Sequence, residues 1–281
     1  MNAHAYAKIN LGLHIVGKRT DGFHNIETVF HRINLFDEIN IENSDDISIV
    51  CSNPSVPSDS SNHCWKAVEI LRKKLGIVNG VAITILKNIP IGAGLGGGSS
   101  DAATVLKLLP QLWHIPIETS VLNAVALQIG SDVPYFLNDS TAYAEGRGEL
   151  LTPMKLILPY WIVLINPNIH LSTPWAYAAL SEQRRGNFPL RPRMLDSVKT
   201  DAIKAILSSG NDFEPVVFEA HVKIKKIKFQ LIELGATHSL MSGSGSSVFG
   251  LFDNMVSALK AVEFFSKEHF VHLTEPNFFP N

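Results

Sequence analysis

Residues 90–103 read Pro-Ile-Gly-Ala-Gly-Leu-Gly-Gly-Gly-Ser-Ser-Asp-Ala-Ala, and this glycine-rich stretch guides the interpretation of the whole chain. The apolar, β-branched run at 81–86 precedes it and predicts a strand. After it, Ser99 or Ser100 is suited to cap a helix that ends at Pro110. Glycines let the backbone curl tightly, and a helix start presents N–H groups that lack intrahelical partners. The stretch therefore predicts an anion-binding loop whose length suits a polyphosphate.

Other glycine-rich motifs fit these residues less well. A Walker A loop requires a lysine after its spacer, and no lysine follows Gly98. Gly92, Gly94 and Gly97 match the dinucleotide-binding fingerprint, but any glycine-dense run produces that match. No acidic residue lies about twenty positions further on to hold a ribose. A flexible linker is the remaining alternative, although linkers are usually followed by polar residues rather than by an alanine- and leucine-rich helix.

The composition is typical of a folded globular protein. Of the 281 residues, 46% are apolar and 18% are charged, and this length suits one large or two modest domains. The net charge of −2 argues against a general nucleic-acid binder, because such proteins are usually basic. Cys51 and Cys64 make neither a CxxC pair nor a disulfide framework, so we expect a reducing, cytoplasmic environment.

The sequence contains no strong signal for a membrane or a metal. Its longest apolar run, near 156–165, contains Pro159 and is too short to span a bilayer. The first residues lack the charged-then-apolar pattern of a signal peptide. The eleven histidines show no HExxH or other metal-ligand spacing. We therefore expect no membrane partner, no nucleic-acid partner and no metal site built from protein side chains.

The glycine-rich stretch resembles the phosphate loop of the GHMP kinases, the superfamily of galactokinase, homoserine kinase, mevalonate kinase and phosphomevalonate kinase. The longer form, Gly-Ala-Gly-Leu-Gly-Gly-Gly-Ser-Ser-Asp-Ala-Ala, is similar to that of the kinases that phosphorylate 4-diphosphocytidyl-2-C-methylerythritol. The resemblance implies that one continuous loop binds ATP. Its residues are Pro90, Gly92, Ala93, Gly94, Leu95, Gly96, Gly97, Gly98, Ser99 and Ser100.

Residues 5–15 alternate between apolar and polar side chains, which predicts a strand. Lys8 and Asn10 lie on the same face of this strand, one pleat apart. The simplest interpretation of that face is the solvent-exposed side of an antiparallel strand. The sequence from Ala7 to Leu11 nevertheless resembles the N-terminal motif of these kinases. That resemblance implies that Lys8 is catalytic and that Asn10 contacts the substrate.

Two segments resemble the parts of these kinases that hold a cytosine. Gly22-Phe23-His24 is similar to a Gly-Tyr-His motif, but Phe23 keeps the aromatic ring and lacks the phenol. A later Ser/Thr-Pro motif followed by an aromatic residue implies that Thr173 and Tyr177 also bind the substrate. Without the resemblance, His24 would be interpreted as a surface histidine and Tyr177 as a core residue at helical spacing.

Three further residues each have two interpretations. Asn62 is suited to cap a helix over 64–75, whereas the resemblance implies a position near adenine. Lys87 is either an ordinary exposed lysine or a partner of the nucleotide. Asp132 precedes a proline near a predicted helix start, where an aspartate can act as a cap. It also resembles the aspartate of the Gly-Ala/Ser-Asp-Val-Pro motif, which implies that Asp132 is the catalytic base and contacts the substrate.

The second half of the chain contains the remaining matches. Residues 211–214, Asn-Asp-Phe-Glu, match these kinases and open a predicted helix. Residues 241–247 resemble the third GHMP motif, a glycine loop that closes over phosphates and substrate. The segment 181–199 is rich in Arg, Pro and Asn, so we expect a loop there. The lysines at 223, 225, 226 and 228 are expected on a solvated helix face.

The resemblance implies an α+β fold with two domains. The N-terminal domain, 1–155, would be of the ribosomal S5 domain 2-like type and the C-terminal domain, 156–281, ferredoxin-like. The implied reaction moves the γ-phosphoryl group of ATP, with Mg²⁺ at the phosphates, to the 2-hydroxyl of 4-diphosphocytidyl-2-C-methylerythritol, on the non-mevalonate route to isoprenoids. Asp132 would accept the hydroxyl proton, and Lys8 would keep that carboxylate ionised. We expect a bacterial, cytoplasmic enzyme that is a monomer or a weak homodimer.

Two alternatives stay open on the sequence alone. The chain could phosphorylate another small alcohol, such as homoserine or mevalonate, but neither substrate carries a pyrimidine for His24 and Tyr177 to contact. It could also be an inactive nucleotide-binding sensor, although the presence of both Lys8 and Asp132 argues against that.

Overall fold

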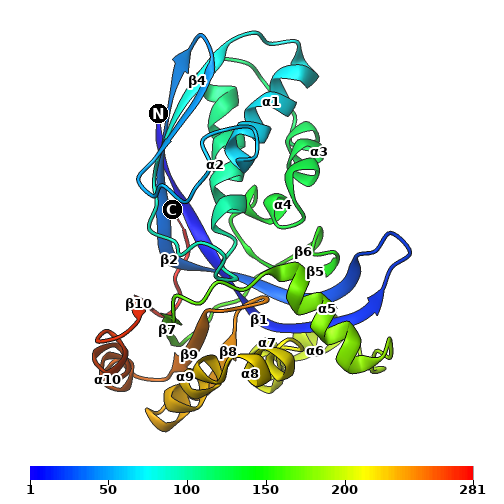
Figure 1. Ribbon diagram of the computed structural model, residues 1–281, viewed down its shortest axis with the longest axis vertical. Coiled ribbons are helices and arrows are strands. Elements are labelled where there is room, and N and C mark those ends of the chain that lie inside the picture. Colours follow the sequence, from blue (N-terminus) through cyan, green and yellow to red (C-terminus); the bar gives the residue numbers. More distant parts are fainter. Residues whose placement is uncertain (281) are drawn as a thin grey trace. The chain divides into compact units, whose positions relative to one another are not determined.

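The computed structural model describes residues 1–280 and mixes helices and strands along the whole chain, as the α+β prediction requires (Figure 1). In chain order the elements are β1 (Asn2–Lys18), β2 (His24–Ser44), β3 (Ile47–Cys51), α1 (His63–Leu75), β4 (Gly80–Leu86), α2 (Gly97–Leu112), α3 (Thr119–Ile129), α4 (Val133–Phe136), β5 (Thr141–Gly146), β6 (Leu150–Met154), β7 (Trp161–Asn166), α5 (Thr173–Arg184), α6 (Met194–Thr200), α7 (Ala202–Ser208), α8 (Glu214–Ala220), α9 (Val222–Glu233), β8 (His238–Met241), β9 (Val248–Phe252), α10 (Met255–Phe265) and β10 (Phe270–Thr274). Within the described part of the chain, no helix is both long and apolar enough to cross a membrane.

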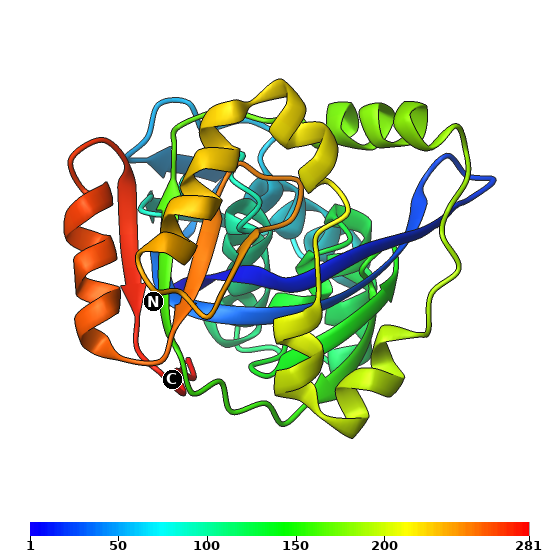
Figure 2. The same ribbon diagram turned by 90° about the horizontal axis from the view of Figure 1, so that it is seen from below.

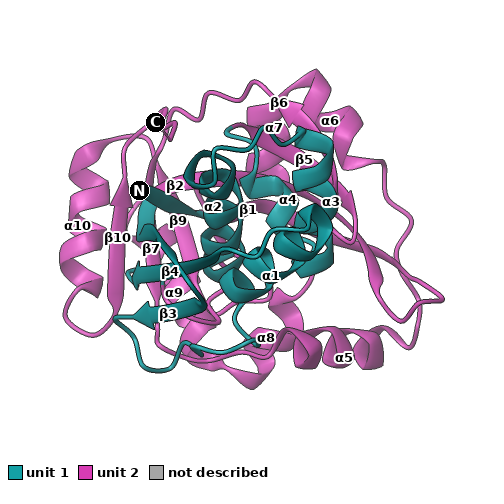
Figure 3. Ribbon diagram, turned by 90° about the horizontal axis from the view of Figure 1, so that it is seen from above, with its two compact units in different colours: residues 1–7, 35–89, 96–139 teal, residues 8–34, 90–95, 140–281 magenta. Residues whose placement is uncertain are grey.

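The chain folds into two compact units that are built from interleaved segments (Figure 3). Unit 1 contains residues 1–7, 35–89 and 96–139, and unit 2 contains 8–34, 90–95 and the chain from 140 onward. Strands β1 and β2 and the glycine-rich loop each contribute residues to both units. The domain boundary near residue 155 stays a prediction, because these units do not correspond to two halves of the sequence.

In unit 1, a short set of strands packs with four helices. Strand β3 pairs in parallel with β4, and β4 pairs antiparallel with the second half of β2, where Ile39 lies opposite Ile85. Alternate side chains of β4, such as Ile83 and Ile85, are buried, while Thr84 between them is exposed. Helices α1 to α4 gather on one side of these strands (Figure 1). The apolar face of the strands is therefore covered by helices.

Helix α2 differs from its predicted bounds at both ends. It begins after Gly96, which adopts a left-handed φ of 70°, so neither Ser99 nor Ser100 is its cap. The Ser100 hydroxyl instead donates to the Tyr6 carbonyl oxygen at 2.7 Å. Pro110 lies inside the helix, which continues to residue 112. Pro110 removes one N–H from the helical ladder and crowds the carbonyl four residues earlier, yet the helix ends only two residues beyond it.

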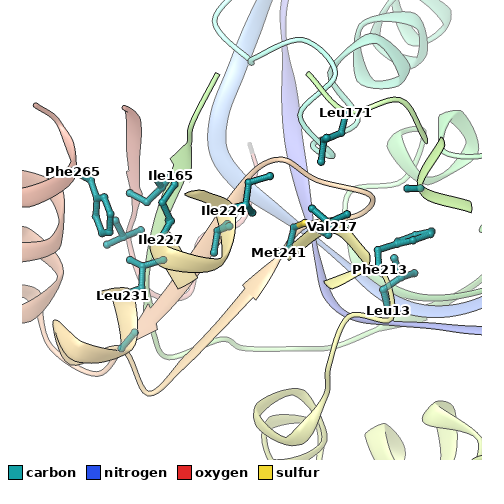
Figure 4. Packing of buried hydrophobic residues seen from close by; sticks show 14 of the residues in the cluster. Leu13, Ile165, Leu171, Phe213, Val217, Ile224, Ile227, Leu231, Met241 and Phe265 are labelled. Atoms are coloured by element: carbon teal, nitrogen blue, oxygen red, sulfur yellow. The ribbon is translucent and has the colours of Figure 1, made fainter. Parts of the chain in front are cut away.

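In unit 2, helices cover an antiparallel four-stranded sheet. Its strand order is β10-β7-β9-β8, and β2 pairs separately with β5, which pairs with β6. Figure 2 shows α10 beside β10 and the long α9 alongside β8 and β9. The side chains that join these elements form one buried cluster (Figure 4). Its labelled members are Leu13, Ile165, Leu171, Phe213, Val217, Ile224, Ile227, Leu231, Met241 and Phe265.

Two other sequence predictions were wrong. The sequence favours one strand over residues 26–34 and another over 37–41, but β2 is continuous through both, since no residue between 35 and 37 breaks the extended backbone. The segment 181–199 is only partly a loop, because α5 continues to Arg184 and α6 begins at Met194. Helix α6 buries Met194, Leu195 and Val198, but seven residues are too few for this spacing to stand out from the polar sequence around it.

Candidate active site

The glycine-rich loop alternates left-handed glycines with ordinary residues. Gly92, Gly94 and Gly96 have φ values of 62°, 76° and 70°, a region that residues with a Cβ rarely adopt. Space is a second constraint, because a Cβ on Gly94 would collide with the Ser242 carbonyl oxygen and one on Gly92 with the His170 ring. The glycines are thus required both for backbone conformation and for close packing.

Protein donors bind the loop's carbonyl oxygens. The Ala93 oxygen accepts from Ser247 N at 3.3 Å, and the Leu95 oxygen accepts from Lys8 N at 3.0 Å. The Gly94 oxygen accepts from the Ser242 hydroxyl at 3.0 Å. In a planar trans peptide the N–H points away from the C=O, so the N–H groups of the three following residues point to the opposite side. A row of backbone N–H groups that leads into a helix start can bind an anion, as the sequence predicts for this loop.

The loop at 241–247 is held by the Asn-Asp-Phe-Glu motif. The Asn211 amide nitrogen donates to the carbonyl oxygens of Met241 and Gly243, at 2.7 and 2.8 Å. A Glu214 carboxylate oxygen accepts from Met241 N at 3.0 Å. The sequence predicted that residues 211–214 open a helix, and α8 confirms this. It did not reveal that two of the motif's polar side chains fix the glycine loop, because those contacts join residues about thirty positions apart.

Lys8 and Asn10 are both buried, with exposed fractions of 4% and 2%. The alternative that they lie on a solvent-exposed strand face is therefore wrong. The Lys8 ammonium nitrogen donates to Asn10 Oδ1 at 2.7 Å and lies 4.7 Å from the centre of the Phe30 ring. A buried ammonium on the polar side of β1 is thus confined by an amide oxygen and an aromatic face.

Asp132 occupies the N-cap position of the short helix α4, but its side chain makes no capping hydrogen bond. Its backbone is helical, with φ −82° and ψ −18°, whereas an N-cap residue is normally extended. The capping role considered for this aspartate is therefore wrong. Asp132 belongs to unit 1 and Lys8 to unit 2, so their action as a pair stays a prediction.

The residues predicted to hold a cytosine come together in unit 2. His24 is buried and stacks on Tyr177, with ring centres 4.7 Å apart, and its Nε2 lies 3.1 Å from the Ser181 hydroxyl. Burial lowers the pKa of His24, and the nearby Lys18 charge lowers it further, so the ring is neutral at pH 7. Because His24 is buried, its assignment as a surface histidine is wrong. Tyr177 contacts Phe213 of the core edge-on, at 4.9 Å.

Phe23 is the exposed member of the predicted cytosine group. Its side chain is 52% exposed, and the Arg147 guanidinium lies 4.8 Å from its ring centre. His24 and Tyr177 stack directly on each other, so the faces they share are already covered. Phe23 therefore offers the most exposed ring of the three. Thr173 lies apart from these rings at the start of α5, where its hydroxyl is 2.9 Å from that of Ser244.

Asn62 and Lys87 are both engaged with neighbouring protein groups. Asn62 caps α1, because its Oδ1 accepts from Cys64 N at 2.8 Å. The Lys87 side chain is only 4% exposed, so it is not an ordinary surface lysine. Its ammonium contacts Asp37 and forms an ion pair with Asp101 at 2.7 Å. A nucleotide contact through either side chain stays a prediction.

The cluster of Asp37, Lys87 and Asp101 was not predicted from the sequence. Burial acts to lower the pKa of Lys87, but the charges of Asp101 and Asp37 outweigh it and raise that pKa. Burial raises the pKa of Asp101, with Lys87 opposing the shift and Asp37 adding to it. One carboxylate oxygen of Asp101, Oδ1, has no hydrogen-bond partner among residues 1–280. Two carboxylates thus share one ammonium, which favours a retained proton.

Two protein-family descriptions match the chain. The GHMP kinase N-terminal domain matches residues 62–139, and the GHMP kinase C-terminal domain matches residues 197–272. A protein of Chlorobium phaeobacteroides (strain BS1), named 4-diphosphocytidyl-2-C-methyl-D-erythritol kinase, is 47% identical over 98% of this chain and 96% of its own length. A protein of Chlorobium chlorochromatii (strain CaD3) with the same name is 43% identical over 99% and 97%.

Solved structures agree with these sequence relatives. A crystal structure of a 4-(cytidine 5'-diphospho)-2C-methyl-D-erythritol kinase superposes with a TM-score of 0.81 at 32% identity, covering 98% of both chains. A homoserine kinase from Cytophaga hutchinsonii has a TM-score of 0.70 at 18% identity, covering 97% of this chain and 94% of that one, and so shares the fold. The chain therefore belongs to the GHMP kinases and, within them, to the 4-diphosphocytidyl-2-C-methyl-D-erythritol kinase family.

Proposed function

We propose that this chain transfers the γ-phosphoryl group of ATP to the 2-hydroxyl of 4-diphosphocytidyl-2-C-methylerythritol, with ADP as the second product. The observation that carries the proposal is the loop at 93–95, whose three carbonyl oxygens are all bound by protein donors. That arrangement turns the following N–H groups to the opposite side, where a polyphosphate can accept from them. The names of the family members supply the acceptor alcohol.

ATP would enter with Mg²⁺, since this ion is usually held by substrate phosphates and few protein groups. Ser99 is the better candidate to meet the ion, because the neighbouring Ser100 is buried and its hydroxyl donates to Tyr6. When bound, Mg²⁺ would neutralise part of the charge that develops on the phosphates. Pro90 to Gly98 would form the cradle, with Asn62 and Lys87 on its flanks as proposed nucleotide contacts.

The chain's own residues would supply positioning and charge. Phosphoryl transfer needs little covalent chemistry from the protein, so orientation and electrostatic stabilisation dominate. Asp132 would accept the proton of the attacking hydroxyl. The Lys8 ammonium would keep Asp132 ionised and offset negative charge on the transferring group. Asn10, which holds that ammonium, would also line the substrate site.

The cytosine would lie on the Phe23 ring, with His24, Tyr177 and Thr173 as further substrate contacts. Phe23 is exposed and has the Arg147 guanidinium above it, so a planar base could occupy that position beside a cation. Stacking of a base on an aromatic side chain contributes about 1–3 kcal/mol in nucleic-acid binders. The absence of a phenol at Phe23 removes a hydrogen-bond donor but no stacking surface. The oligomeric state, a monomer or a weak homodimer, stays a prediction.

The test compares turnover of the cytidylylated methylerythritol with turnover of homoserine and mevalonate. We expect phosphorylation of the first alone. Asp132→Asn should reduce turnover by roughly 10²–10⁴-fold, the usual share of a general base, while ATP still binds in calorimetry. Near-normal turnover by a folded Asp132→Asn enzyme would remove Asp132 as the base. Phosphorylation of homoserine or mevalonate at a comparable rate would overturn the substrate assignment.

A further inference from the structure

The Lys8 ammonium is held in place by a short relay of neutral groups. It donates to Asn10 Oδ1 at 2.7 Å, and Asn10 Nδ2 donates to Thr28 Oγ1 at 2.9 Å. The Thr28 hydroxyl in turn donates to the Gly12 carbonyl oxygen at 2.5 Å. Thr28 is fully buried, with an exposed fraction of 0%, and lies on β2 beside β1.

In each hydrogen bond of the relay, only one of the two groups can be the donor. A carbonyl oxygen can only accept, so the hydroxyl hydrogen of Thr28 must point at Gly12. The Thr28 oxygen therefore presents a lone pair to Asn10, and the NH₂ group of Asn10 must donate to it. The amide oxygen of Asn10 then faces Lys8, whose ammonium can only donate. Three hydrogen bonds thus select one of the two orientations of the Asn10 amide.

We propose that Thr28 is a positioning residue for phosphoryl transfer, because it orients the Asn10 amide so that its oxygen holds the Lys8 ammonium. This inference rests on the proposed role of Lys8. Thr28 itself would touch neither substrate. Without its hydroxyl, the amide could rotate by half a turn and present NH₂ to the ammonium. Two donors would then face each other, and the ammonium would lose the hydrogen bond that orients it from this side.

The decisive comparison is between Thr28→Val, which keeps the shape and removes the hydroxyl, and Thr28→Ser, which keeps the hydroxyl and removes a methyl group. We expect Thr28→Val to reduce kcat by about 10- to 100-fold. This is the size of effect expected when a hydrogen bond to a charged group is lost, here the bond between Asn10 and the Lys8 ammonium. The KM for ATP should change less than about twofold, because the phosphate loop is separate. Thr28→Ser should restore most of kcat. Thermal melting tests whether each variant is folded. If Thr28→Val does not fold, Thr28→Ala is used in its place.

A double-variant cycle separates this inference from the proposed function. If Lys8 is catalytic, Lys8→Ala is nearly inactive, and Lys8→Ala combined with Thr28→Val should be no worse. High turnover by Lys8→Ala would overturn the proposed role of Lys8. An inactive Lys8→Ala alongside a Thr28→Val enzyme within about twofold of normal kcat would overturn the positioning role alone. Equal losses in Thr28→Val and Thr28→Ser would also overturn it, because they would indicate packing rather than the hydroxyl.

Discussion

Two lysine side chains of this protein are buried, and their described contacts differ in kind. Lys87, in unit 1, lies between the carboxylates of Asp37 and Asp101. Lys8, in unit 2, donates to the amide oxygen of Asn10 and lies over the Phe30 ring. Both side chains have the same chemistry, so the difference lies in these contacts. The carboxylates bind the Lys87 ammonium within the fold, whereas the amide and the ring help to fix the position of the Lys8 ammonium.

The Lys87 cluster connects both ends of the phosphate loop. Asp37 accepts from the backbone N–H groups of Asn88 and Ile89, at 2.6 and 2.8 Å, just before the loop. Lys87 links Asp37 to Asp101, in the first turns of α2 just after the loop. The Asp37 carboxylate balances the ammonium even while Asp101 retains its proton, so Lys87 has little charge left to offer a phosphate.

Two neutral groups help to fix the position of the Lys8 ammonium. The Asn10 amide oxygen and the Phe30 ring both attract a cation. A charge that is held in a fixed position can stabilise the transition state of phosphoryl transfer, since it needs no reorganisation during the reaction. We therefore expect Lys87 to stabilise the fold and Lys8 to act in catalysis.

The largest expected effect is on stability, at Lys87. Lys87→Met should lower the free energy of unfolding by about 3–5 kcal/mol, because it leaves two buried carboxylates without their cation. Urea denaturation followed by circular dichroism would measure this loss. Lys107→Met is the control, since it breaks an ion pair with Asp139 that is 2.9 Å long but exposed, and such a pair contributes at most about 1 kcal/mol. Equal losses of stability in the two variants would contradict the anchoring role of Lys87.

The second effect is on turnover, at Lys8. Lys8→Met should lower kcat by about 10²–10³-fold, similar to the loss of one preorganised electrostatic group at an active site. The KM for ATP should change little. The measurement is steady-state kinetics at saturating ATP, with the folded fraction of Lys8→Met checked by circular dichroism. If Lys87→Met lost as much kcat as Lys8→Met while still folded, the division of roles would be wrong.

The most gradual effect is a pH dependence of stability that depends on Asp101. Its pKa is raised by burial from 3.8 to about 8, so between these values the folded state retains a proton that the unfolded chain has lost. This proton contributes its full stabilisation of the folded state below pH 3.8, and that stabilisation is lost as the pH rises through about 8. In this window the free energy of unfolding should fall by at most about 1.4 kcal/mol per pH unit.

Asp101→Asn should flatten that pH dependence, since an amide does not titrate. The quantity to measure is the difference in unfolding free energy between the two proteins from pH 5 to pH 8, so that effects of the histidines cancel. The variant should gain stability relative to the original chain as the pH rises. A difference that does not vary with pH would show that Asp101 retains no extra proton.

Features of the fold that depend on neighbouring residues could be predicted from the sequence. The N-cap at Asn62 and the strand over residues 5–15 depend on residues close together in the chain, and the structure confirmed both. The start of α2 was misassigned because serines are common caps, whereas a left-handed Gly96 fills that position here. Pro110 was taken as a stop because its position relative to the helix end is not visible in the sequence.

By itself, the sequence determined which family the chain resembles, and it predicted a phosphate loop and a set of candidate site residues. These conclusions rest on glycine spacing and short motifs, which consist of neighbouring residues. Only the tertiary structure decided which carboxylates contact Lys87 and which amide orientation Asn10 adopts. Those properties come from contacts such as Lys87 with Asp37 and Asn10 with Thr28, which join residues far apart in the sequence. Burial and partner charge are set by folding, so no local pattern encodes them.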